Sequence, residues 1–147
     1  MAENQVDGAV LAGRFLQMLN DHDPDAVDSF VAVDYINHNA FVEDGREGNR
    51  VFWADFFTAI PDVTVTMEDL VVAGDRVVGR FIYRGTHLGP LWGLPATGNP
   101  IEMRSIDIWR VEEGELAEHW DELNLLEVFQ ALGMIPPLSV GGPEAQQ

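Results

Sequence analysis

The sequence of 147 residues contains no lysine and no cysteine. Without lysine, the protein cannot form a Schiff base with a carbonyl substrate or with pyridoxal phosphate, and it cannot build a Walker-type nucleotide loop. Without cysteine, thiol nucleophiles, CxxC redox centres, cysteine-bound zinc and disulfides are excluded as well. Any catalysis must therefore use carboxylates, imidazoles, hydroxyls, a bound metal or an external cofactor.

Positive charge is also scarce. Eight arginines oppose 25 acidic residues, which gives a net charge of -17. Such a chain repels phosphate backbones and anionic lipids, so we expect no nucleic-acid partner and no membrane partner. No apolar run approaches the roughly 20 residues of a membrane helix, and residues 1–8 lack the basic side chains of a signal peptide. We therefore expect a cytoplasmic protein whose negative charge serves solubility.

The first half of the chain has mainly helical patterns. Apolar residues at helical spacing predict a first helix that ends near Leu19 and a later one over about 52–60 that Pro61 stops. Asp23-Pro24 suits the start of a short helix that runs to about Phe30. We interpret 31–40 as an extended or irregular connector and 45–48 as a loop.

The second half has mainly strand patterns. Alternating hydrophobicity predicts four strands, at 63–72, 76–87, 101–111 and 115–121. A long loop at 88–100 separates the second from the third, and a closing helical segment is expected at 123–132. Together the patterns predict one α+β domain over 1–138, with helices on one face of an antiparallel sheet, and a loose tail at 139–147.

The predicted strands have one polar and one apolar face. The arginines of the second and third strands share the polar face, while Phe81, Tyr83, Met103 and Trp109 share the apolar face. The same alternation places Ser105 and Asp107 on the apolar face, where polar groups are uncommon. These residues are therefore candidates for a site.

The turn of the last hairpin decides which further residues lie on the apolar face beside Ser105 and Asp107. A three-residue loop at 112–114 would place Asp107 opposite His119 and Ser105 opposite Asp121, all on the apolar face. A two-residue Glu113-Gly114 turn would instead turn His119 and Asp121 outward. We predict the three-residue loop, because a glutamate is unfavourable at the positive φ that the tight turn needs.

Carboxylates on an apolar face have a specific chemical consequence. Burial raises the pKa of a carboxyl group, and a second carboxylate nearby raises it further. Asp121, with Asp107 and His119 beside it, could therefore take up and return a proton near neutral pH. The alternative for Asp107 and His119 is a buried pair that only orders the hairpin.

Several short motifs resemble those of the SnoaL-like polyketide cyclases. These motifs are Tyr35-Ile36-Asn37-His38-Asn39, Gly85-Thr86-His87-Leu88-Gly89, Gly93-Leu94-Pro95-Ala96-Thr97-Gly98, and the hairpin Arg110–Gly114 followed by His119-Trp120-Asp121. Their order along the chain is more specific than any one of them. The resemblance implies a nuclear-transport-factor-2-like cone, in which a curved antiparallel sheet wraps around about three helices and encloses one apolar pocket.

The resemblance also implies an activity. The family's acid/base aspartate falls on Asp121, which would catalyse an intramolecular aldol cyclisation of a polycyclic aromatic polyketide without metal or other cofactor. Some members are recruited to ring hydroxylation instead, and Asp107 is a departure that could mark such a change. A non-catalytic binding module is a third alternative; a pocket filled by Trp53 and Trp109 would favour it.

Further candidates would contact the hydrophobic substrate. The predicted substrate-binding residues are His38, Asn39, Trp53, Phe57, Tyr83, His87, Trp92, Met103, Ser105 and Trp109. Their alternatives are ordinary ones, because aromatics at helical spacing are commonly core and loop histidines commonly bond to nearby backbone. His38, His119 and Asp121 could ligate a metal, but we expect none. We expect a homodimer or homotetramer from the resemblance.

Overall fold

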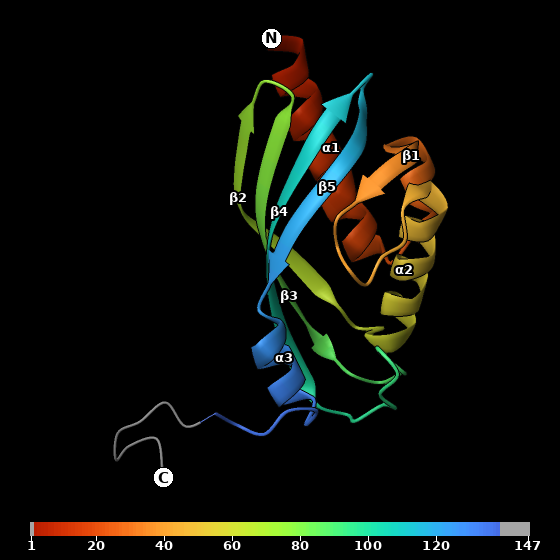
Figure 1. The fold of residues 1–147 in the computed structure, drawn as a ribbon, viewed down its shortest axis with the longest axis vertical. Helices are drawn as coiled ribbons and strands as arrows, with labels where there is room; N and C mark the ends of the chain where they lie inside the picture. Colours follow the sequence, from red (N-terminus) through yellow and green to blue (C-terminus); the bar gives the residue numbers. More distant parts are fainter. Residues whose placement is uncertain (1, 139–147) are drawn as a thin grey trace.

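The computed structural model describes residues 2–138, with side chains from residue 7 onward, and shows the predicted α+β architecture (Figure 1). The predicted tail at 139–147 lies outside the described residues. None of the described helices has the length and apolar character that crossing a bilayer requires. The elements in chain order are α1 (Ala2–Asp21), the 3-10 helix η1 (Pro24–Ser29), β1 (Val31–Asn37), α2 (Gly45–Ala59), β2 (Thr64–Ala73), β3 (Arg76–Thr86), β4 (Pro100–Glu112), β5 (Glu115–Leu123) and α3 (Leu125–Ala131).

The sheet has five strands in the order β1-β5-β4-β3-β2. Strands β2 to β5 form the predicted antiparallel meander, whereas β1 pairs in parallel with β5. The predicted antiparallel sheet is therefore extended by one parallel strand, and residues 31–37, predicted as part of an extended or irregular connector, form this edge strand. Because β1 and β5 are about 80 residues apart in the sequence, no local pattern could reveal their pairing.

The helices cover the apolar face of the sheet. Helix α1 packs on β2 and β3, and α2 packs on β1 and η1 (Figure 1). Between them, Phe81, Tyr83, Met103 and Trp109 are buried, as the strand alternation predicts. This burial of large apolar surface is the main source of the fold's stability.

Two helical predictions need correction. Residues 45–48, predicted as a loop, form the first turn of α2. The Arg46 side chain anchors this turn, because it donates to the Val31 carbonyl and pairs with Glu115. The predicted short helix after Asp23 is a 3-10 helix, capped by the Asp23 carboxylate, which accepts from the Asp25 N–H.

The last hairpin has a register that differs from the prediction. Its turn has two residues, Glu113 and Gly114, with φ of 50° and 75°, so the predicted three-residue loop is wrong. Glutamate tolerates the left-handed region here despite a typical cost of about 1–2 kcal/mol. The tight primed turn matches the twist of the two long strands, which favours it.

A β-bulge in β5 then changes which face of the sheet the following side chains occupy. Val111 pairs with Leu116, but Arg110 pairs with Glu118, so Ala117 is the extra residue and is buried beside Leu116. The bulge reverses the alternation, and the polar residues beyond it face the apolar side as predicted. Their partners are different, however. In place of the predicted pairs, Asp107 lies opposite Asp121, Trp109 opposite His119, and Ser105 opposite Leu123.

Candidate active site

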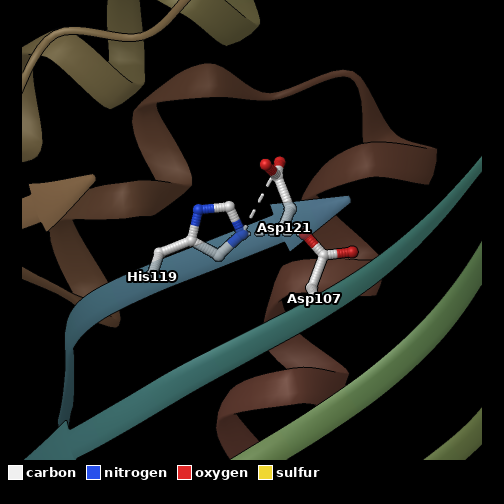
Figure 2. A group of neighbouring side chains, drawn as sticks. All are labelled: Asp107, His119 and Asp121. Atoms are coloured by element: carbon white, nitrogen blue, oxygen red, sulfur yellow. Dashed lines mark hydrogen bonds and ion pairs between the residues drawn. The ribbon is translucent and has the colours of Figure 1, made fainter. Parts of the chain in front are cut away.

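Two carboxylates and an imidazole meet on the inner face of the sheet. Asp107 comes from β4, and His119 and Asp121 come from the neighbouring strand β5 (Figure 2). His119 Nε2 lies 2.8 Å from Oδ1 of Asp107 and 3.9 Å from Oδ2 of Asp121. The side chains of Asp107, His119 and Asp121 are 4%, 9% and 12% exposed. The cluster is therefore almost wholly removed from bulk water, and Asp121 retains the most access.

The hydrogen bonds of His119 indicate where its protons lie. Its Nδ1 lies 3.0 Å from Oδ1 of Asn37, and the same oxygen accepts the backbone N–H of Asn39. The backbone donor identifies this Asn37 atom as an oxygen, which is an acceptor with two lone pairs. It can therefore accept a second hydrogen bond, from Nδ1–H of His119. Nε2 faces the Asp107 carboxylate, also an acceptor. A ring protonated on both nitrogens satisfies both bonds and places a positive charge beside two carboxylates.

Asp107 is held from two sides. In addition to His119, its second carboxylate oxygen accepts from the Ser105 hydroxyl at 2.5 Å. Burial raises the pKa of the Tyr83 hydroxyl well above its ordinary value, and the negative charge of Asp107 raises it further. Tyr83 therefore stays a neutral hydroxyl beside this carboxylate. These contacts place the predicted residues Ser105 and Tyr83 next to the cluster.

Asp121 has the properties of a tunable base. Burial raises the pKa of its carboxyl group, and the nearby charge of Asp107 adds to this effect. The charge of His119 and the hydrogen bond from Asn39 oppose it. Asn39 Nδ2 donates to both oxygens of Asp121, at 3.0 and 2.9 Å. The balance leaves the pKa above the usual aspartate value, which moves it toward the range useful for proton transfer.

The sequence reasoning missed Tyr35 as a member of this site. Its hydroxyl accepts from the Trp109 indole N–H at 3.2 Å, and its ring stacks on His119 with centroids 6.2 Å apart. Burial raises the pKa of Tyr35 well above its ordinary value. The signal was present, because Tyr35 opens the motif from which His38 and Asn39 were selected. Asn37, in the same motif, is also absent from the predicted site residues, and its side chain contacts Nδ1 of His119.

Five of the predicted substrate-binding residues lie in the hydrophobic core. Trp53, Phe57, Tyr83, Met103 and Trp109 belong to the buried core. Trp53 stacks nearly parallel on Tyr83, with centroids 6.4 Å apart, and Trp109 stacks on His119 at 5.4 Å. The aromatic core thus extends from α2 to the polar cluster without interruption.

The two candidate loop histidines lie outside the cluster. His38 pairs with Glu118 at 2.8 Å and stacks on Trp120, two residues whose side chains are on the other face of β5. The hydrogen bond from His38 lowers the pKa of Glu118. His87 is fully buried, and its Nδ1 accepts from the Thr97 N–H at 3.2 Å. The structure therefore does not bring either histidine to Asp121.

A cavity of about 790 Å³ lies beside α2, away from the cluster. Its walls are the outer side of α2, residues 41–44 and residues 90–93, and they include Trp92. None of Asp107, His119 and Asp121 lines it. The cluster and the cavity come close to each other in the sequence at residues 39–41. Asn39 contacts Asp121, and Phe41, two residues later, lines the cavity.

The cluster also has a composition that metals use. One ligand-type atom from each of Asp107, His119 and Asp121 lies within 4.8 Å of the others. In the structure, however, Nε2 of His119 is hydrogen-bonded to Asp107. A metal would have to replace the proton in that bond, so the arrangement as it stands suits proton transfer by the side chains themselves.

The fold and the cluster together define a class of small α+β proteins with a carboxylate–imidazole site on a curved sheet. A sequence model described as SnoaL-like polyketide cyclase matches residues 9–132. The chain belongs to the SnoaL-like polyketide cyclase family and has its nuclear-transport-factor-2-like fold.

Individual relatives agree with this assignment. Aklanonic acid methyl ester cyclase DnrD of Streptomyces peucetius is 24% identical over 128 residues, which cover 84% of this chain and 88% of DnrD. The structure of TsrD from Streptomyces laurentii has a TM-score of 0.83 at 35% identity, and the match covers 89% of this chain and 98% of TsrD. IdmH from Streptomyces antibioticus, a candidate polyketide cyclase, has a TM-score of 0.71 at 29% identity, covering 86% and 98%.

Proposed function

We propose that the protein catalyses an intramolecular aldol cyclisation of a polycyclic aromatic polyketide, with Asp121 as the acid/base. The observation that carries this proposal is the position of the Asp121 carboxylate, which is largely buried, has a raised pKa, and lies between Asn39 and His119. A carboxylate in such an environment can accept a proton from carbon and still return it.

The reaction needs two proton transfers and no net change in composition. The Asp121 carboxylate removes a proton from the carbon between two activating groups of the substrate, which leaves an enolate. The enolate carbon attacks a ketone carbonyl of the same molecule, forming the new carbon–carbon bond while the carbonyl π pair moves to oxygen. The protonated Asp121 then gives its proton to that alkoxide. The product is an isomer of the substrate, and the carboxylate is restored.

The neighbouring groups have separate tasks in this proposal. His119 supplies positive charge near the carboxylate and the developing enolate, and Asp107 with Asn37 fixes the orientation of its ring. Asn39 orients Asp121. The buried aromatic side chains that extend from α2 to the cluster would contact the rings, and for this Trp53 and Trp109 must yield space to the substrate.

A non-catalytic binding role is a second candidate, because one observation favours it. Trp53 and Trp109 fill the inner face, Asp121 is hydrogen-bonded to Asn39, and the cavity beside α2 does not reach Asp121. A protein of this kind would bind a ligand without removing a proton from it. Proton exchange at the substrate separates the two roles directly.

The test uses the compound after which the relative DnrD is named, aklanonic acid methyl ester. In D₂O, the wild-type protein should catalyse exchange of the acidic carbon-bound proton and formation of an isomer of unchanged formula, followed by NMR and chromatography. Asp121→Asn should lower the rate by about 10²–10⁴-fold. Asp34→Asn removes a carboxylate at an exposed position of β1 and should leave the rate unchanged. Full activity of Asp121→Asn would refute the acid/base assignment, and ligand binding without exchange by the wild type would favour the binding module.

A further inference from the structure

The cavity beside α2 is large enough for a small organic ligand. Its volume of about 790 Å³ is in the range of ordinary ligand sites, about 300–1,000 Å³. One wall is the side of α2 that faces away from the core, and the opposite wall is the loop at 90–93 between β3 and β4. The proposed reaction does not use this space.

Aromatic side chains from separate segments form much of the cavity wall. Phe41, Phe52 and Trp92 all line it. Trp92 packs on Phe41 with ring centroids 5.2 Å apart, and it also forms an edge-to-face pair with Phe129 of α3 at 5.5 Å. The Trp92 backbone has a φ of 49°, a left-handed value that is costly for a bulky residue. Residues in such strained conformations cluster at ligand clamps and active sites, which supports a binding role for this wall.

The titratable residues of the wall all have the same charge. Four of the lining residues are acidic and none is basic; they are Glu43, Asp44, Glu47 and Asp55. Glu47 pairs with Arg50, whereas within residues 7–138 the other three carboxylates form no ion pair. Six of the other arginines are already paired with acids elsewhere. The cavity therefore combines aromatic faces with uncompensated negative charge.

We propose that this cavity binds an aromatic cation, meaning a flat ring system that carries a quaternary or protonated nitrogen. The rings would pack against Trp92, Phe41 and Phe52, whose π faces attract positive charge. The carboxylates of Asp55 and its neighbours would attract the nitrogen. An aromatic carboxylate would be repelled, and a neutral ring would gain only the apolar contacts. This inference goes beyond the proposed function, because no member of the Asp121 cluster lines the cavity.

Calorimetric titration with three flat two-ring probes of similar size tests the charge selectivity. The probes are 1-methylquinolinium, quinoline at pH 8, and 1-naphthoate, which are cationic, neutral and anionic. We expect 1-methylquinolinium to bind at least about fivefold more tightly than quinoline, and 1-naphthoate to bind most weakly. The preference should shrink at 0.5 M salt, because the carboxylates are exposed. Equal affinity for the cation and the neutral ring would overturn the proposal.

Variants locate the site. Asp55→Asn removes a lining carboxylate that forms no ion pair or side-chain hydrogen bond in the described part of the chain, so the fold should not change. It should weaken 1-methylquinolinium binding about threefold to tenfold. Asp34→Asn removes an equal charge at an exposed position of β1 outside the cavity wall and is the matched control. An equal effect of both variants would mean that only the net charge attracts the probe, and would refute the site.

Two more variants complete the test. Trp92→Leu should weaken both 1-methylquinolinium and quinoline, because it removes an aromatic wall that they share. Asp121→Asn should bind 1-methylquinolinium as the wild type does. Unchanged binding in Trp92→Leu, or a loss in Asp121→Asn as large as that in Asp55→Asn, would place the probe elsewhere. Because binding is measured directly, the proposed cyclisation can fail without affecting this result.

Discussion

Oδ1 of Asn37 lies 3.0 Å from Nδ1 of His119, and the two residues are direct partners in the parallel pairing of β1 with β5. The edge strand β1 therefore does more than extend the sheet. It brings an acceptor to the far side of the imidazole, so that both ring nitrogens face oxygen atoms. This relationship is what makes His119 a candidate source of positive charge next to Asp121.

Replacing Asn37 by the similarly sized leucine should change the protonation of His119. The Nδ1–H would lose its acceptor, which makes a proton at that nitrogen unfavourable by about 1–3 kcal/mol. We expect nitrogen-15 NMR to show a proton on Nδ1 of His119 in the wild type and none on that nitrogen in Asn37→Leu. Cyclisation should slow about tenfold or more, because the positive charge beside Asp121 is reduced.

His87 provides an internal reference for that measurement. Its Nδ1 accepts the Thr97 N–H, so its ring should carry a proton only on Nε2 in both proteins. A wild-type spectrum in which Nδ1 of His119 carries no proton would contradict the assignment of its hydrogen bond to Asn37.

The fold was largely predictable from periodicity, and the limits have physical causes. Strand β4 alternates cleanly, and β3 does so over most of its length, because one face of these strands is buried against the helices and the other is more exposed. The edge strand β1 was not recognised as a strand, because its partner lies on β5, far away in the sequence. The first turn of α2 was mistaken for a loop because Gly45 and Gly48 suggest one, whereas contacts of Arg46 with Val31 and Glu115 stabilise helix there.

Asp107, His119 and Asp121 share one face of the sheet, as the strand alternation predicts, but their cross-strand pairing differs from the prediction. Two deviations from the regular hairpin, the tight turn at Glu113 and the bulge at Ala117, cancel in their effect on side-chain facing. Asp107, His119 and Asp121 therefore converge, although Asp107 is opposite Asp121 and not His119. Neither deviation has a clear sequence signal, because glutamate is a poor residue for a positive φ and residues 115–118 contain no glycine that would mark a bulge.

Asn39 should set the pH at which Asp121 becomes active. Its hydrogen bonds stabilise the carboxylate and so lower the pKa of Asp121 against the larger effect of burial. Asn39→Leu should raise that pKa further. A general base works in its ionised form, so the rising, acidic limb of the pH–rate profile should move to higher pH, with a smaller change on the plateau.

Asn99→Leu is the control for the pH profile. It removes an amide that donates to the Ala131 carbonyl, a contact outside the cluster, and should leave the acidic limb in place. A shift of the limb to lower pH in Asn39→Leu would show that the amide does not stabilise the ionised form of Asp121.

Glu113 stores strain that a better turn residue should release. Its φ of 50° precedes Gly114 at 75°, the backbone of a primed turn for which Asn-Gly is the preferred pair. Glu113→Asn should raise the free energy of unfolding by about 0.5–1 kcal/mol, which corresponds to a rise in Tm of about 1–4 °C for a domain of this size. Glu112→Asn, in the regular strand beside it, should give no such gain. Calorimetric melting of both variants measures the difference, and a lower Tm for Glu113→Asn would contradict the assigned turn.

The outer face of the sheet is the expected contact surface of a homodimer or homotetramer. Among its polar residues it exposes a group of apolar side chains, with Val71 58%, Ile106 50% and Ile108 37% exposed. Val71 and Ile108 are in line across the sheet, because both pair with Val78. Such a patch is better buried against a second copy than left in water.

Ile108→Glu should therefore convert the oligomer into monomers, because it places a charge in the middle of that patch, where a partner would bury it without compensation. Sedimentation velocity of the wild type should give the mass of a dimer or tetramer, and that of the variant about 16.3 kDa. Val10→Glu adds the same charge on α1, where Val10 is 46% exposed, and should leave the oligomer intact. A monomeric wild type, or dissociation by Val10→Glu alone, would show that the outer face is not the contact surface. Because Ile108 points away from Asp107 and Trp109, its neighbours in β4 that face the core, the monomer should keep its hydrogen-bonded cluster.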